Sequence, residues 1–165
     1  MAGFTKALEL DPTDAKSHAN RGAIYLRWKQ PKQALPELNE AIRLKPDLVM
    51  AHVYRGYCYF ALGQHKRAIE NYDEALRLDP KNASAYNGRG ISQNELGRTK
   101  VAIEDFSQAI AADPTYVEAY QNRAICYKAI GKSKLAKQDL ATIEELKAAA
   151  NPSAKPTPAP PKRNN

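Results

Sequence analysis

Four arginines recur at intervals of 34 residues along the chain: Arg21, Arg55, Arg89 and Arg123. A row of guanidinium groups on one surface could bind phosphates or carboxylates, because each presents several N–H donors in one plane. Sixteen positions after each arginine, however, comes an acidic or amide residue: Glu37, Asn71, Asp105 and Asp139. Between antiparallel helices, this offset can place the two side chains opposite each other. We therefore expect structural pairs, and only Arg55, which faces an amide, is a candidate for a free guanidinium.

The histidines and cysteines are spaced too widely for a metal site or a disulfide. His18 and His52 are one 34-residue interval apart, which between neighbouring helical units means about 8–10 Å, whereas a metal ion needs its ligands within about 2.3 Å. His65 is expected in a turn without a partner. Cys58 and Cys126 are two intervals apart, too far for the roughly 7 Å between Cα atoms that a disulfide allows. We expect packing histidines, free thiols, and neither a metal nor a cofactor.

Motifs of known catalytic sites are missing from the sequence. The chain lacks the nucleophile elbow of hydrolases, the His-Glu-x-x-His motif of zinc proteases and a phosphate-binding glycine loop; Gly88 and Gly90 have no third glycine at the required offset. We expect the acidic residues mainly on solvent-facing surfaces or opposite the arginines. The sequence therefore predicts a protein that is not an enzyme.

Prolines, alanines and glycines share the interval of the arginines. The series are Pro12, Pro46, Pro80 and Pro114; Ala34, Ala68, Ala102 and Ala136; and Gly22, Gly56, Gly90 and then Ala124. Agreement of several independent series on one period indicates a repeat array. Within each unit, apolar residues recur at steps of three and four, which is the period of a helix. In three units a central glycine separates two such runs, so each unit is predicted to be a helix–turn–helix.

These residues resemble the tetratricopeptide repeat, a family with a 34-residue unit of two helices. The resemblance implies an all-α, right-handed superhelical solenoid of antiparallel helix pairs, in which the first helix of every unit lines a concave groove. It implies four complete units, at residues 15–48, 49–82, 83–116 and 117–150, the last one closed by a polar capping helix. Residues 1–14 correspond to a partial preceding unit, of which only the second helix is present.

The two ends of the chain differ from the repeats. Residues 4–10 form an apolar face without a preceding helix, and such an edge can mediate self-association. Residues 151–165 are rich in proline and basic residues and contain no bulky apolar side chain, so we expect a disordered basic tail. Residues 158–163 also fit a P-x-x-P-x-R ligand pattern, which composition alone can produce.

The family resemblance also implies which side chains face a ligand. Carried over to this chain, the candidates for a peptide-binding groove are Met50, Val53, Tyr57, Phe60, Asn87, Ile91, Asn94, Gln121, Ile125 and Lys128. The second unit supplies an apolar and adaptable patch of the kind that binding hot spots favour. The amides could bond the backbone of an extended peptide. Part of this face, Val53 and Ile91 in particular, could instead pack inside the superhelix.

One branch of the family binds the C-terminal carboxylates of heat-shock chaperones through a clamp of lysine, asparagine and arginine side chains. The corresponding residues here are Ala19, Ala23, Tyr54, Ser84 and Gly88 or, one unit later, Val53, Tyr57, Gly88, Glu118 and Asn122. Neither set can form the clamp, so we expect a different ligand.

The net charge of +7 invites a nucleic-acid interpretation, but the charge is not gathered into one stripe. Residues 15–48 carry +4 and residues 151–165 carry +3. Nucleic-acid binding is therefore not expected, although the basic first unit and tail keep it as an alternative. The chain shows no apolar run long enough to span a membrane and no signal-peptide pattern. Together with unpaired cysteines, this favours the cytoplasm without fixing the compartment.

The sequence as a whole predicts a non-catalytic protein–protein interaction module or scaffold, which binds a peptide or partner helix in its concave groove. One alternative is binding of nucleic acid or an acidic partner through the basic first unit and tail. Another is self-association, or a structural role in a longer polypeptide, through the apolar edge at residues 4–10. The identity of the partner does not follow from the sequence.

Overall fold

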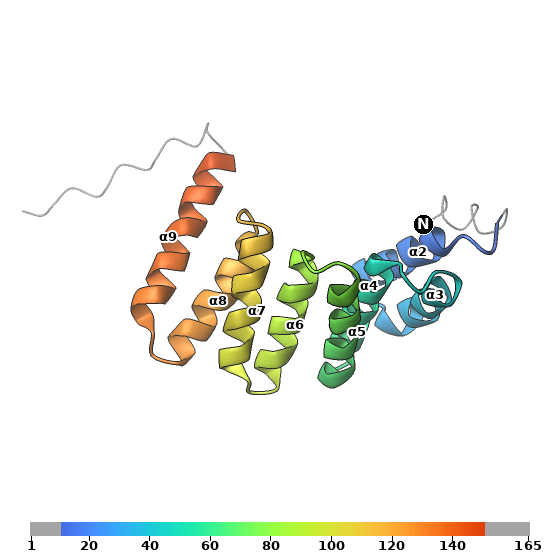
Figure 1. Ribbon diagram of the computed structural model, residues 1–165, viewed down its shortest axis with the longest axis horizontal. Helices are drawn as coiled ribbons and strands as arrows, with labels where there is room; N and C mark the ends of the chain where they lie inside the picture. The colour runs from blue at the N-terminus through green and yellow to red at the C-terminus, as the bar shows by residue number, and fades with distance from the viewer. Residues whose placement is uncertain (1–10, 151–165) are drawn as a thin grey trace, which may run out of the picture.

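The protein is an all-α repeat solenoid, which confirms the predicted fold class. The computed structural model describes residues 11–150; residues 1–10 of the predicted partial unit and the predicted tail lie outside the described residues. The described part has eight helices and no strand: α2 (Ala15–Arg27), α3 (Pro31–Leu44), α4 (Val49–Ala61), α5 (His65–Leu78), α6 (Ala83–Glu95), α7 (Thr99–Ala112), α8 (Val117–Ala129) and α9 (Ser133–Ala150). They stack in chain order (Figure 1). Between residues 11 and 150, none is long and apolar enough to cross a membrane.

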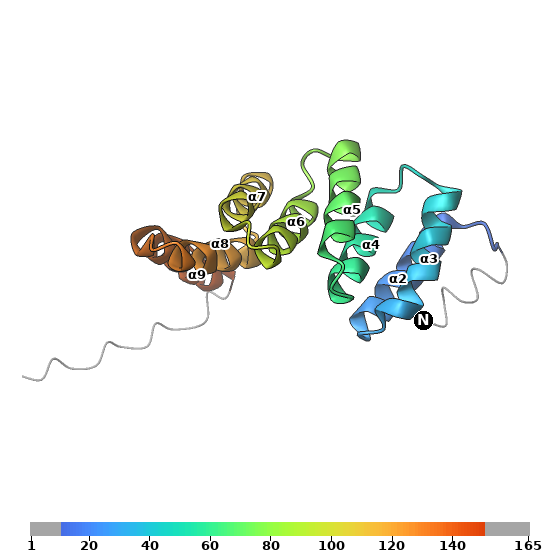
Figure 2. The same cartoon turned by 90° about the horizontal axis from the view of Figure 1, so that it is seen from below.

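The helices alternate between two sides of the stack. The first helices, α2, α4, α6 and α8, each pack against the second helix of their own unit, and α4, α6 and α8 also pack against that of the unit before. Successive first helices contact one another, whereas over the described range no Cα atoms of α3, α5, α7 and α9 come within 8 Å of another second helix. The stack therefore curves toward the first helices, which line its concave side. Figure 2 shows the same stack from below.

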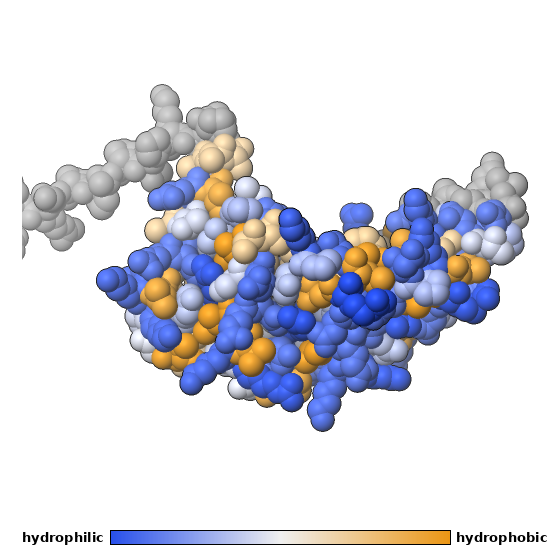
Figure 3. Space-filling model, viewed as in Figure 1, coloured by the Kyte–Doolittle hydropathy of each residue, from blue (hydrophilic) through white to orange (hydrophobic). Residues whose placement is uncertain are grey.

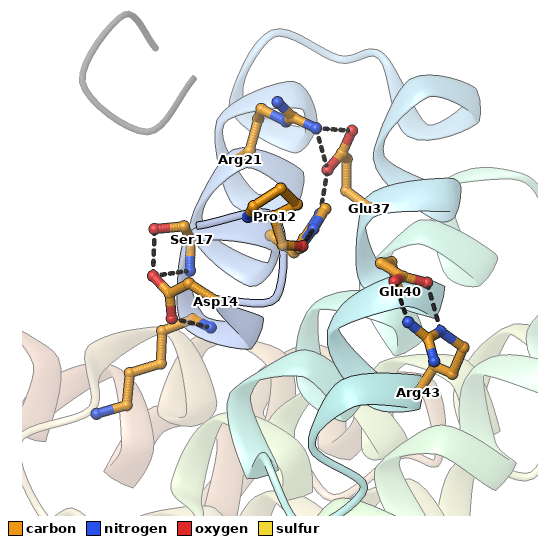
Figure 4. Close-up of polar contacts among 9 residues, drawn as sticks. Pro12, Asp14, Ser17, Arg21, Glu37, Glu40 and Arg43 are labelled. Atoms are coloured by element: carbon orange, nitrogen blue, oxygen red, sulfur yellow. Dashed lines mark hydrogen bonds and ion pairs between the residues drawn. The ribbon is translucent and has the colours of Figure 1, made fainter. Parts of the chain in front are cut away.

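Local sequence explains where the helices begin and turn. Asp14 caps α2 by accepting hydrogen bonds from two backbone N–H groups of the first turn (Figure 4). The turn inside each unit needs one left-handed residue, and three units supply a glycine: Gly63, Gly97 and Gly131, with φ of 73°, 76° and 76°. Lys29 adopts this conformation in the first unit, with φ of 57°. Pro36 lies inside α3, which runs on from Pro31 to Leu44.

The core of each unit forms where a first-helix glycine meets a large side chain sixteen residues later. Leu38, Tyr72 and Phe106 are at most 1% exposed. A Cβ atom on Gly22, Gly56 or Gly90 would lie 2.7 Å, 2.6 Å or 2.7 Å from the nearest atom of Leu38, Tyr72 or Phe106, respectively. These distances are shorter than van der Waals contact, so only glycine permits this approach.

The fourth unit departs from this arrangement. It has Ala124 in place of the glycine, and the side chain sixteen residues later, Leu140, is 39% exposed. In the other units, the next first helix helps to cover the equivalent side chain, as Gly88 of α6 does for Tyr72. Ile143 of α9 is 2% exposed and keeps the helix packed against α8. The end of the array is thus looser than its interior.

The contact between Gly90 and Phe106 provides a test of this packing. Alanine favours a helix over glycine by about 1 kcal/mol, yet Gly90→Ala should lower the free energy of unfolding by about 1–3 kcal/mol, because the new methyl group meets a buried ring. Urea titration followed by circular dichroism measures the change.

A double-mutant cycle supplies the control. Removing the ring removes the clash, so Gly90→Ala should cost less when combined with Phe106→Ala than it does alone. A Gly90→Ala variant as stable as the native chain would show that the two helices can separate at this point without cost.

Candidate functional site

Three of the four arginines form ion pairs within their units, as the spacing predicts. The shortest N···O distances are 2.7 Å for Arg21 and Glu37, 2.6 Å for Arg89 and Asp105, and 2.7 Å for Arg123 and Asp139. Figure 4 shows the first of these pairs. Arg55 instead donates from Nε to the amide oxygen of Asn71 at 2.6 Å. Each arginine therefore joins the two helices of its own unit.

Three of these arginines make a second contact, which the sequence analysis missed. The partner lies sixteen residues before the arginine, on the second helix of the preceding unit: Asn39 for Arg55 at 3.1 Å, Asp73 for Arg89 at 2.6 Å and Ser107 for Arg123 at 2.9 Å. The polar residues sixteen positions before these arginines are the feature of the sequence that could have predicted the second contact. The arginine series thus joins neighbouring units and does not form an open ladder for a ligand.

His18 and His52 serve packing, as expected, whereas His65, which was expected in a turn without a partner, begins α5 and has an aromatic neighbour. His18 and His52 each donate from Nε2 to the carbonyl of a proline six residues earlier, at 3.1 Å and 2.8 Å, and Tyr120 does the same with its hydroxyl at 3.3 Å. These side chains fasten the start of a first helix to the turn before it. His65 packs against Phe60, with ring centroids 5.3 Å apart. Throughout the described residues, no three His, Cys, Asp or Glu side chains are grouped as metal ligands.

The predicted groove residues differ widely in accessibility. Met50 and Ile125 are 40% and 61% exposed. The remaining side chains are exposed at Gln121 and Lys128, partly buried at Tyr57, Phe60, Ile91 and Asn94, and buried at Val53 and Asn87. Only part of the predicted set is therefore presented to solvent.

Val53 and Asn87 are both buried, which for Val53 is the inside packing that the sequence left open. Val53 has no exposed surface and lies in one buried cluster with Tyr72. The Asn87 amide is 5% exposed and engaged at both ends: it donates to the Tyr116 hydroxyl at 3.4 Å and accepts from Asn122 at 2.9 Å. The side chain that was expected to bond a peptide backbone joins α6 to the start of α8.

Two further groove candidates have neighbours within the protein. Tyr57 donates its hydroxyl proton to the Ser84 carbonyl at 3.4 Å and packs edge-on against Tyr72. Burial raises the pKa of Tyr57 above its usual range, so this phenol stays protonated. The amide oxygen of Asn94 accepts from Thr99 at 3.1 Å. Both side chains support the groove wall more than they offer free polar groups.

A hollow opens on the concave side between α2 and α4. Its volume is about 220 Å³, and its lining is Lys16, Ala19, Asn20, Leu48, Met50 and Tyr54. The carbon-rich side chains of Leu48, Met50 and Tyr54 form its apolar part, while Lys16 and Asn20 add polar groups from α2. Of the ten predicted groove residues, only Met50 belongs to this hollow. Tyr54 lies four residues, or one helical turn, after Met50, so its helical phase was the feature of the sequence that could have identified it.

The surface in the view of Figure 3 mixes apolar and polar residues along the whole stack. Apolar side chains appear in small patches between hydrophilic ones, and no single strip of one kind runs across the molecule. Besides Met50 and Ile125, the large exposed apolar residues of the described chain are Trp28, Val101, Leu135 and Leu140. A ligand that binds this surface would have to make several separate, small apolar contacts.

Sequence profiles of one family match most of the chain. Profiles described as "TPR repeat" and "Tetratricopeptide repeat" match residues 56–97, residues 83–116, and residues 4–35 together with 106–138. The chain belongs to the tetratricopeptide repeat family. No curated protein has a sequence that matches this chain.

Solved structures of tetratricopeptide repeat proteins have the same fold. A crystal structure of MamA has a TM-score of 0.78 at 23% identity, over 90% of this chain and 87% of that one. YrrB, described as "a TPR protein with an unusual peptide-binding site", has a TM-score of 0.72 at 23% identity, over 87% and 74%. The second TPR of Spaghetti (RPAP3), bound to the HSP90 peptide SRMEEVD, has a TM-score of 0.59 at 29% identity, over 62% and 95%.

Both cysteines are free and buried inside this repeat fold. Cys58 has no exposed surface and Cys126 is 2% exposed. Burial raises the pKa of the Cys58 thiol to about 12 and also raises that of Cys126. Because the thiolate is the reactive form, both groups should be inert in the folded protein.

Thiol labelling tests this expectation. At pH 8, a thiol-specific reagent such as Ellman's reagent should leave the folded chain unlabelled and should react with both cysteines in denaturant. The variants Cys58→Ala and Cys126→Ala assign any signal to one thiol. Rapid labelling of the folded chain at either position would show that the unit around that cysteine opens readily.

Proposed function

We propose that this chain is a protein-interaction module that holds a peptide or partner helix against the concave side of its first helices. The observation that carries the proposal is the hollow between α2 and α4, which is apolar around Met50 and Tyr54 and polar at Lys16 and Asn20. A concave site with an apolar lining and a few polar groups is the usual form of a site that accepts a side chain of a ligand.

Two of the similar structures support a peptide as the ligand. YrrB is described by its peptide-binding site, and the second TPR of Spaghetti is bound to a peptide of HSP90. Both share the stacked helix pairs of this chain, so the same scaffold can present a peptide-binding surface. The family resemblance and the hollow together favour binding over catalysis, and we propose a non-catalytic role.

The accessible part of the predicted groove sets the expected mode of binding. One apolar side chain of the ligand would enter the hollow beside Met50, and a second would contact Ile125 of α8, which is 61% exposed. Gln121 and Lys128 on the same helix could bond polar groups of the ligand. Four first helices at about 9 Å spacing span roughly 30 Å, which about eight or nine residues of extended peptide would cover.

The ligand should differ from a chaperone tail. At the clamp positions of the first unit the chain has Ala19, which lines the hollow, and Ala23. These methyl groups offer no donor to a terminal carboxylate. We therefore expect the affinity to come from apolar side chains of the peptide, with Lys16 adding an ionic contact at the edge.

A library of random peptides displayed on phage tests the proposal. Peptides selected on the native chain should bind the Met50→Glu variant at least about tenfold more weakly, because the new carboxylate has to enter an apolar hollow. Fluorescence anisotropy with a labelled copy of the selected peptide measures the change. Circular dichroism checks that the variant is folded.

The matched control is Val101→Glu. Val101 is 41% exposed, almost the same as Met50, but it lies on the second helix α7. This variant should bind the selected peptides like the native chain. Equal loss in both variants, or selected peptides that are indifferent to Met50→Glu, would contradict binding in the hollow. Binding that is limited to a single-stranded RNA oligomer and falls steeply with salt would favour the basic surface instead.

A further inference from the structure

Arg55 has a different environment from the other three arginines of its series. Its Nε donates to Asn71 at 2.6 Å and its Nη1 donates to Asn39 at 3.1 Å. Both partners are amides, and the Asn71 side chain is oriented by its own donation to the Arg67 carbonyl at 2.7 Å. The two amide oxygens therefore occupy the positions at which Arg89 of the third unit meets the carboxylates of Asp73 and Asp105.

Among the described residues, no carboxylate forms an ion pair with Arg55. Over residues 11–150, no carboxylate oxygen lies within 4.0 Å of its guanidinium, whereas the other three arginines each have an ion pair of 2.6–2.7 Å. The charged group that acts on it is another cation, Arg67, which lies over the Tyr59 ring at 4.8 Å. Burial is the main cause that lowers the pKa of Arg55; Tyr59 acts in the opposite direction and Arg67 adds a smaller lowering, although a guanidinium stays charged at neutral pH.

One end of the Arg55 guanidinium is open. Nη2 has no hydrogen bond to any described residue and is not among the buried atoms without a partner. Asn39 is exposed, and Arg55 itself is partly exposed. The group lies between α3 and α5, two second helices that do not contact each other. The free N–H donors of Nη2 therefore remain accessible beside Asn39 and Asn71, on the side of the stack away from the concave groove.

We propose that the partly exposed Arg55 guanidinium, held between Asn39 of α3 and Asn71 of α5, is a binding site for a carboxylate. Three observations favour this chemistry. The equivalent arginines all bind carboxylates with the same guanidinium group, which shows that the local backbone suits such pairs. The positions equivalent to Asp73 and Asp105 hold neutral amides, so no negative charge stands at these two positions. Arg67 adds a second positive charge nearby.

The energetic reason for binding is a partly buried charge without a counter-ion. Such a group gains more from an ion pair than an exposed arginine does, because part of its solvation has already been lost. The carboxylate could come from an acidic side chain of a partner protein or from a small free acid. The site is separate from the concave groove, so the two proposals can fail independently.

Thermal unfolding in acetate and in chloride at equal ionic strength tests the site. Acetate should raise the Tm of the native chain by a few degrees in a saturable manner, since a ligand that binds only the folded state stabilises it. Asn71→Asp places a carboxylate where the third unit has Asp105. This variant should unfold at a higher temperature than the native chain in chloride and should show no acetate-specific rise.

A second variant guards against misfolding of the first. Asn39→Asp changes an exposed side chain. It introduces the residue found at the equivalent position of the next unit, Asp73, which pairs with Arg89. This variant should also remove the effect of acetate. An acetate effect of the same size in all three proteins would be a general salt effect and would overturn the proposal, as would the lack of any effect.

A short oligoglutamate peptide distinguishes the two sources. If it raises the Tm of the native chain at much lower concentration than acetate does, and fails to do so with either aspartate variant, an acidic partner segment is the ligand. If it acts no more strongly than acetate, the site takes a small free carboxylate.

Discussion

The structure depends on one close approach in each of the first three units, where a glycine of the first helix meets a buried side chain sixteen residues later. Phe106, for example, lies so near Gly90 that no side chain fits between the helices. Because this contact fixes the register of the two helices, it also places the preceding residues, Arg89 and Asp105, opposite each other. Steric fit and charge pairing are therefore two results of the same alignment, and neither could shift without the other.

The arginines carry this alignment from one unit to the next. Arg89 bonds Asp105 in its own unit and Asp73 in the preceding one, so a single side chain ties three helices together. In a repeat array, stability is approximately the sum of the units and of the contacts between neighbours. Here polar bonds at the interface supplement apolar packing such as that of Tyr72 between Gly56 and Gly88. Neighbouring units behind the concave surface are therefore joined both by polar bonds and by apolar packing.

Periodicity alone was sufficient to predict the helices, their pairing and the arginine contacts within each unit. It could not predict which groove side chains remain accessible, because that depends on residues that differ between units. Val53 is covered because Tyr72 packs beside it, and Asn87 is engaged because Tyr116 and Asn122 of the following unit reach it. A family pattern assigns a position to a face of the helix; the neighbours at that position decide whether the side chain is free.

The lack of an ion pair at Arg55 depends on the junction between two units and not on one unit alone. Its two amide partners come from different units, Asn71 from its own and Asn39 from the one before. If the second unit were duplicated in tandem, the arginine of the new copy would face Asp73 in place of Asn39. Recombination that changes only the order of the units could therefore create or erase such a charged position without altering any residue within a unit.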